Sequence, residues 1–193
     1  MERRRRKRRS TIPGAFPGPD VILPDVLAPG LHLVLCGTAP SRISAAARAY
    51  YANPGNRFWP TLHEVGITPL RLRPEDYAQV LQFGIGLTDL CKTEKGSDAE
   101  LSPAAFDVPG FVAKMRAVRP AAIAFDSKTA AQAFFGRPVL YGRQPVGLDR
   151  TPVFVLPSPS GRARRWWDIR PWQEAGRFVQ ARRAASPRPA SAR

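Results

Sequence analysis

Three stretches of small, polar and aromatic residues carry the side chains that could do chemistry in this chain of 193 residues. The first begins with Gly37-Thr38-Ala39-Pro40-Ser41. Gly37 lets the backbone turn sharply, and no long side chain obstructs a pocket floor at this point. Backbone amides there can face the polar edge of a ligand. A phosphate-binding loop is excluded, because no Gly-Lys-Ser or Gly-Lys-Thr follows.

Two adjacent tyrosines continue this first stretch within the segment YYANPGNRFW. The flat rings of Tyr50 and Tyr51 are suited to stacking on a nucleic-acid base, which contributes roughly 1–3 kcal/mol per base. Adjacent tyrosines are also typical of a pair with one ring in the core and the other on the surface. The pattern alone leaves both interpretations open.

The second stretch supplies two carboxylates, Asp89 in GLTDL and Asp98 in KGSD. A carboxylate can activate a water molecule or stabilise a developing cation. Asp98 follows the flexible pair Gly96-Ser97, and it also fits a loop or helix-cap aspartate. Asp89 ends a predicted strand, where bonding to neighbouring backbone is the favoured role.

The third stretch is LPSPSGRARRWW, in which small polar residues precede three arginines and two tryptophans. Hydroxyls and backbone amides hold phosphates, arginines neutralise them, and a protruding side chain can wedge into a base stack. A serine hydrolase is excluded, because Gly-x-Ser-x-Gly is absent and no histidine lies nearby. The candidate nucleic-acid contacts are Ser158, Ser160, Gly161, Arg162, Ala163 and Arg164.

Strands and helices alternate along the sequence, which predicts an α/β fold with a mainly parallel sheet and helices on both faces. Ligands of such folds bind at the carboxyl ends of the strands, so the three stretches should converge there. Asn56 is the expected N-cap of the first helix. The predicted strands are 31–36, 85–90, 121–125 and 152–156, and the predicted helices are 58–65, 74–83, 108–118, 127–135 and 171–183.

The formal charge of +15 is concentrated at the two ends of the chain. We predict a basic tail at residues 1–20, one globular domain at 21–180 and a second basic tail at 181–193, because blocks of like charge and prolines resist folding. The tails fit either a solvated end or a tether to phosphates. Two cysteines and two histidines make a disulfide framework or a structural zinc site improbable, and no apolar run reaches a membrane span.

Together the motifs resemble the uracil-DNA glycosylase superfamily, and most closely the mismatch-specific uracil/thymine-DNA glycosylases. The resemblance covers roughly Leu31 to Arg177 and depends on GTAPS, NPGNRFW, GLTDL and LPSPSG occurring in that order. It implies a three-layer α/β/α sandwich with a central, mainly parallel sheet. It also implies a monofunctional hydrolase that flips uracil out of DNA and excises it in base excision repair, without a metal or cofactor.

By the match of motifs, the resemblance implies that Gly37 to Ser41 and Ser158 bind the base and that Tyr51 is the aromatic residue that stacks on it. It also implies that Ser160 to Arg164 form the intercalation loop, with Arg162 as the wedge. Well-known members carry an asparagine that positions the attacking water at the place of Ala39. Asp98 is the expected replacement, with Asp89 as the other candidate. A non-catalytic DNA-binding module of the same fold is the alternative. The expected protein is a cytoplasmic, nucleoid-associated monomer that binds DNA and no membrane.

Overall fold

A five-stranded sheet forms the centre of the computed structural model, which describes residues 21–185. Its strand order is β2-β1-β3-β5-β4, and every neighbouring pair is parallel except β4 with β5. The crossovers in this order bring the carboxyl ends of β1, β2, β3 and β5 to one edge. The strands are β1 (Leu33–Gly37), β2 (Ile85–Asp89), β3 (Ile123–Phe125), β4 (Gly142–Arg143) and β5 (Val153–Val155).

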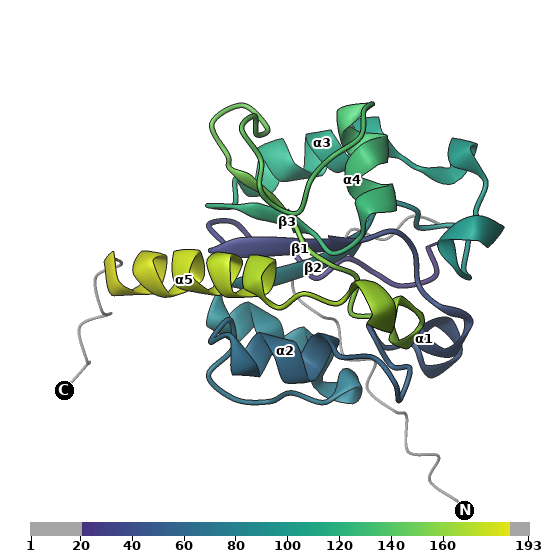
Figure 1. The fold of residues 1–193 in the computed structure, drawn as a ribbon, viewed down its shortest axis with the longest axis horizontal. Helices are drawn as coiled ribbons and strands as arrows, with labels where there is room; N and C mark the ends of the chain where they lie inside the picture. The colour runs from purple at the N-terminus through teal and green to yellow at the C-terminus, as the bar shows by residue number, and fades with distance from the viewer. Residues whose placement is uncertain (1–20, 186–193) are drawn as a thin grey trace, which may run out of the picture.

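Helices cover both faces of this sheet (Figure 1). Helices α3 (Val108–Val118) and α4 (Lys128–Phe135) lie on one face, and α2 (Phe58–Glu64) and α5 (Arg170–Ala185) lie on the other. Alternate side chains of β1 enter the two cores: Leu33 and Leu35 pack with the α2 and α5 side, whereas Val34 and Cys36 pack with α3 and α4. The predicted three-layer α/β/α sandwich is confirmed.

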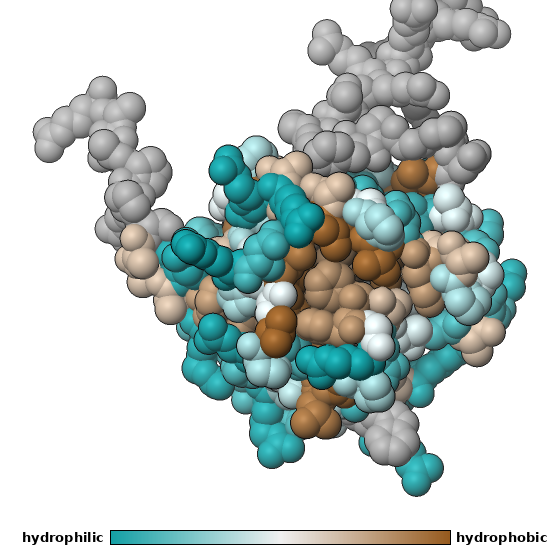
Figure 2. Space-filling view, turned by 90° about the horizontal axis from the view of Figure 1, so that it is seen from above, coloured by the Kyte–Doolittle hydropathy of each residue, from teal (hydrophilic) through white to brown (hydrophobic). Residues whose placement is uncertain are grey.

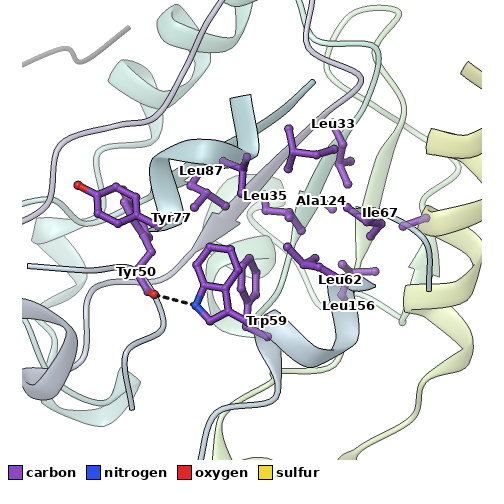
Figure 3. Close-up of a cluster of buried hydrophobic side chains, with 14 of the residues drawn as sticks. Leu33, Leu35, Tyr50, Trp59, Leu62, Ile67, Tyr77, Leu87, Ala124 and Leu156 are labelled. Atoms are coloured by element: carbon purple, nitrogen blue, oxygen red, sulfur yellow. Dashed lines mark hydrogen bonds between the residues drawn. The ribbon is translucent and has the colours of Figure 1, made fainter. Parts of the chain in front are cut away.

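Aromatic residues fill the core between the sheet and α2, next to the segment that contains Tyr50 and Tyr51 (Figure 3). The indole of Trp59 donates a hydrogen bond of 3.1 Å to the backbone carbonyl of Tyr50. This bond fixes the segment that precedes Tyr51 against a packed layer that contains Leu35 and Leu62. The first candidate stretch is therefore anchored by the core and not only by its own turns.

Every predicted strand and helix is present, with ends shifted by at most two residues. Residues Pro74–Phe83 form a 3₁₀ helix, η1, and shorter 3₁₀ turns occur at η2 (Asp98–Glu100), η3 (Pro103–Ala105) and η4 (Gly161–Trp166). The sequence prediction lacks α1 (Arg42–Ala47) and β4. Helix α1 begins where the Ser41 hydroxyl accepts a hydrogen bond from the Ser44 amide, and at six residues it is too short to show a period.

Two boundaries differ from the prediction. Arg57, not Asn56, is the N-cap of α2, although the Asn56 side chain still accepts a hydrogen bond of 2.8 Å from the Phe58 amide. The predicted tail boundary at residue 180 falls inside α5, which continues to Ala185 because Arg183 donates hydrogen bonds to the carbonyls of Gly66, Ile67 and Phe83. The predicted basic segment 1–20 and residues 186–193 lie outside the described residues.

The surface near the edge strand β4 carries exposed apolar side chains. Leu140 and Val146, which flank β4, are the most exposed large hydrophobic residues in the described part of the chain. Figure 2 shows apolar residues open to solvent among hydrophilic ones on the face viewed from above. Within residues 21–185, none of the helices combines the length and the apolar character that a membrane crossing requires.

Arg183 provides a test of the corrected boundary. Replacing it with alanine leaves three buried or half-buried carbonyls without their charged donor, and we expect unfolding free energy to fall by about 1.5–3 kcal/mol. Denaturant unfolding measures this loss. Arg177→Ala, on an exposed position of the same helix, is the matched control and should change stability by less than about 0.5 kcal/mol. Equal effects of the two variants would mean that residues 181–185 do not contribute to the stability of the domain.

Candidate active site

Strand register places three residues side by side at the carboxyl edge of the sheet. Gly37 at the end of β1 is paired with Asp89 at the end of β2. Cys36 is paired with Phe125 of β3, so Asp126 follows on the other side of Gly37. A cavity of about 390 Å³ opens over this row, at the edge where α/β folds bind their ligands.

A glycine is needed at position 37 because the floor of the cavity has no room for a side chain there. The backbone of Gly37 is not in the left-handed region, so the sharp turn expected from its sequence is not the reason. A Cβ at this position would lie 2.6 Å from Asp89 Oδ1, 3.3 Å from the Tyr51 hydroxyl and 3.6 Å from Asp126 Oδ1. The missing side chain therefore allows these three polar groups to approach one another.

Several buried polar atoms around Gly37 have no hydrogen-bonding protein partner within the described part of the chain. They are the Thr38 hydroxyl, the Tyr51 hydroxyl, Asp89 Oδ2 and Asp126 Oδ2, and all four residues line the cavity. Buried polar atoms are nearly always paired, because an unpaired one costs about 1–3 kcal/mol. Such a concentration of unpaired donors and acceptors is typical of a site that is completed by a polar ligand.

The two buried carboxyl groups of this row have raised pKa values. Burial raises the pKa of Asp89 to about 6, and the charge of Lys92 opposes this rise. Burial raises the pKa of Asp126 to about 8; the charges of Asp89 and Asp98 add to the rise, and the Tyr51 hydroxyl opposes it. At neutral pH Asp126 therefore holds a proton more firmly than Asp89 does, and the pair can supply one donor and one acceptor.

Asp98 lies at the same cavity on a different support. It is the first residue of η2, and its carboxylate Oδ2 accepts a hydrogen bond of 3.1 Å from the Ser127 hydroxyl. Ser97, whose side chain and backbone pair reciprocally with Glu100, caps this turn, so Asp98 is not the cap residue that its sequence also allowed. Asp98 remains exposed and is held at the cavity by a residue from the end of β3.

The two tyrosines have different roles. Tyr50 is buried, donates to the carbonyl of Pro24 and contacts the Lys92 ammonium at 3.0 Å. Tyr51 lines the cavity, and its ring stacks on Phe58 with centroids 3.5 Å apart. A base can thus stack only on the opposite face of Tyr51. The left-handed backbone of Tyr51, with φ of +53°, is a strained conformation of the kind found at functional sites.

The third candidate loop closes the cavity from the other side. The carbonyl of Pro159 accepts a hydrogen bond of 2.9 Å from the Arg57 amide, which joins this loop to the segment before α2. A Cβ at Gly161 would lie 3.0 Å from the Gly55 carbonyl oxygen, so the two loops are in close contact. The loop contributes Ser158, Ser160, Arg162 and Ala163 to the cavity wall.

A second hollow of about 570 Å³ adjoins the cavity and shares Ser41, Asn53 and Arg162 with it. Arg42, Gly161 and Arg164 also line it. Arg42 forms a 2.8 Å ion pair with Glu100, whereas Arg162 and Arg164 are exposed. A polar pocket that opens onto an arginine-lined groove is suited to a ligand with a small ring and an anionic backbone.

The structure brings all of the sequence-predicted site residues to these two hollows, with Gly161 and Arg164 on the groove only. Sequence reasoning missed Asp126 and Ser127, which follow β3, and also Asn53, Asn56 and Ser44, which line the cavity. A signal for the first pair was present, because a polar Asp-Ser follows a predicted parallel strand. Within residues 21–185 no three His, Cys, Asp or Glu side chains are grouped as metal ligands would be.

Comparisons with known proteins identify the family and the fold. The family model of the uracil DNA glycosylase superfamily matches residues 24–180, which include all the strands and every residue that lines the two hollows except Leu23. The chain belongs to the uracil DNA glycosylase superfamily. Its fold is also similar to the solution NMR structure of a Methanosarcina acetivorans protein provisionally named a uracil DNA glycosylase. The TM-score is 0.59 and the identity 24%, over 83% of this chain and 96% of that one.

The raised pKa of Asp126 predicts a pH dependence of stability. Below about pH 4 both folded and unfolded states are protonated, whereas from about pH 4 to 8 only the folded state keeps the proton, so unfolding free energy falls as pH rises. Each retained proton contributes a slope of up to roughly 1.4 kcal/mol per pH unit. Asp126→Asn should flatten the fall, which urea unfolding between pH 5 and 8 measures. An unchanged slope would mean that Asp126 is ionised in the folded protein.

Proposed function

We propose that this member of the uracil DNA glycosylase superfamily is a monofunctional DNA glycosylase that excises uracil from DNA for base excision repair. The supporting observation is the cavity over Gly37, where unpaired polar atoms and the fixed carboxylate of Asp98 meet beside an arginine-lined groove. The family match and the name of the M. acetivorans protein point to the same chemistry.

A cavity of about 390 Å³ fits a single base and not a duplex, so the target nucleotide has to be flipped out. Flipping costs a few kcal/mol and least at a weak pair such as G·U, which favours uracil in mismatches. The base would stack on the open face of Tyr51. Ser158 would contact the base in the cavity. Arg162, exposed at the junction of cavity and groove, would fill the gap in the helix, while Arg164 and the Ser160 hydroxyl would contact phosphates.

The reaction breaks the bond between C1′ of the sugar and the base nitrogen. The electron pair leaves with the base, and the sugar gains oxocarbenium character that a carboxylate can stabilise. Water adds its oxygen to C1′, and Asp98 takes up one of its protons and passes it to solvent. The departing base anion takes a proton from solvent. Backbone amides of the Gly37–Ser41 loop would stabilise the anion while it forms.

The alternative is a DNA-binding module without catalysis, and Ala39 favours it because alanine can neither orient nor activate water. The Ser127–Asp98 hydrogen bond favours the enzyme, since it fixes a carboxylate at the cavity without any help from Ala39. We also propose that the protein acts on DNA as a monomer, in the cytoplasm near the nucleoid.

Incubation with a duplex that contains one uracil, followed by alkali cleavage at abasic sites, separates the two candidates. A glycosylase produces one strand break at the uracil, with faster cleavage opposite guanine than opposite adenine. Binding without any break at enzyme saturation would establish the non-catalytic module.

Asp98→Asn tests the catalytic carboxylate. The amide keeps the shape and still accepts from Ser127, but the charge is lost, so single-turnover cleavage should fall by roughly 10²–10⁴-fold while DNA binding persists. Asp76→Asn, at an exposed pair with Gln79, is the matched control. If Asp98→Asn keeps full activity and a folded Asp89→Asn is inactive, Asp89 is the catalytic carboxylate.

Arg162→Ala tests the wedge. A side chain that fills the gap left by the flipped nucleotide matters only where a partner strand must be held open. Cleavage of the G·U duplex should therefore fall by about tenfold or more, whereas cleavage of single-stranded uracil DNA stays within about threefold. The ratio of the two single-turnover rates is the readout. Equal losses on both substrates would reduce Arg162 to a phosphate contact.

A further inference from the structure

Asp126 is a buried titratable group that has no role in the reaction proposed for Asp98. Only 3% of its surface is exposed, yet it lines the cavity, and its Oδ2 atom has no protein hydrogen-bond partner within residues 21–185. The three residues before it, Ile123 to Phe125 of β3, are apolar and buried. The Tyr51 hydroxyl interacts with this carboxyl group, but Oδ2 stays unpaired. A buried oxygen without a partner is costly, and at the wall of a cavity a polar ligand can pair it.

The position of Asp126 separates it from the other carboxyl groups. Gly37 lies between Asp126 and Asp89, and a Cβ on Gly37 would touch both side chains. Asp98 is held on the exposed side by Ser127, the residue next to Asp126. Asp126 thus occupies the enclosed floor of the cavity, and Asp98 the side that opens to solvent and to the groove.

We propose that Asp126 donates a hydrogen bond from a neutral carboxyl group to a carbonyl oxygen of the extruded base. This inference rests on the proposed glycosylase function and adds a catalytic residue to it. The contact selects bases with exocyclic carbonyl oxygens, such as uracil and hypoxanthine. It strengthens as negative charge develops on the base during cleavage of the bond to C1′, while the proton stays on Asp126.

The surroundings of Asp126 keep it neutral. Asp89 faces it from β2, Asp98 from η2, Cys36 from β1 and the Tyr51 hydroxyl from the loop after α1. Burial raises the pKa of Asp126 most, and the charges of Asp89 and Asp98 raise it further. The Tyr51 hydroxyl opposes this rise through its interaction with the carboxyl group, but the pKa still reaches about 8. Among the described residues that line the cavity there is no histidine, and Arg162 is the only one with a cationic side chain. A neutral acid is therefore the donor that the floor offers.

The experiment compares full-length wild type with Asp126→Asn and Asp126→Ala in single-turnover cleavage of a uracil duplex between pH 6 and 9.5. Wild-type cleavage should fall above about pH 8, as Asp126 loses its proton. The amide of Asp126→Asn donates at every pH, so this variant should lack the alkaline fall. Asp126→Ala should lose about 10²-fold at pH 7, the effect of removing one preorganised donor. Asp149→Asn, an exposed left-handed position, is the control.

A second substrate separates catalysis from a structural role. 5-Fluorouracil leaves as a more stable anion, so the loss caused by Asp126→Ala should be at least fivefold smaller with it than with uracil. A distorted cavity would slow both bases equally. Equal losses, wild-type activity of Asp126→Ala, or an unchanged alkaline fall in Asp126→Asn would each overturn the assignment.

Absence of cleavage by the wild type would instead refute the glycosylase, and a binding measurement then decides on Asp126. The probe is a duplex with a 2′-fluoro-substituted uracil nucleotide that resists hydrolysis. Asp126→Ala should weaken binding of this probe by about tenfold and leave binding of an unmodified duplex unchanged. Equal binding of the probe by both proteins would remove Asp126 from the base contact.

Discussion

The site depends on the parallel register of three neighbouring strands. Because β1 pairs with both β2 and β3, the residues at their carboxyl ends form one row, Asp89, Gly37 and Asp126. The middle position has no room for a side chain, since a Cβ there would lie 2.6 Å from Asp89 Oδ1. A shift of one residue in either pairing would point a carboxyl group toward the apolar core and place an apolar side chain at the cavity. The apolar layers on both faces fix this register.

Much of the fold could be predicted because it depends on local patterns. The apolar runs of the strands and the periodicity of α3 are visible in the sequence, and so is the order of elements that a parallel sheet requires. Helix α1 and strand β4 escape such reasoning, because their few residues are placed by tertiary contacts. The role of Arg183 could not be predicted for the same reason. The carbonyls that it binds, those of Gly66, Ile67 and Phe83, are at least 100 positions away in the chain.

The candidate site divides in the same way. Asp98 and the Ser158 loop could be found, because their motifs stand in loops that a parallel sheet brings together. The hydrogen bond from Ser127 to Asp98 could not be predicted, since the two residues are 29 positions apart and are brought together by the crossover from β2 to β3. The sequence predicts the position of Gly37 at the site but not the reason for the glycine. A sharp turn is expected there, whereas the structure shows that a side chain would collide with Asp89.

Charges behind the cavity floor explain why two buried carboxyl groups in one row differ. Asp25, fully buried, forms ion pairs of 2.8 Å with Lys92 and Lys114 and accepts from the Thr88 hydroxyl. These lysines lower the pKa of Asp89. The pKa of Asp126 is raised by burial and by the charges of Asp89 and Asp98, and the Tyr51 hydroxyl and the backbone amide of Asp126 oppose this rise. Breaking a buried pair leaves a charge uncompensated, so the lysines are held firmly in place. The lysines of these ion pairs thereby keep Asp89 the stronger acid of the two, so that a proton shared by the row stays on Asp126.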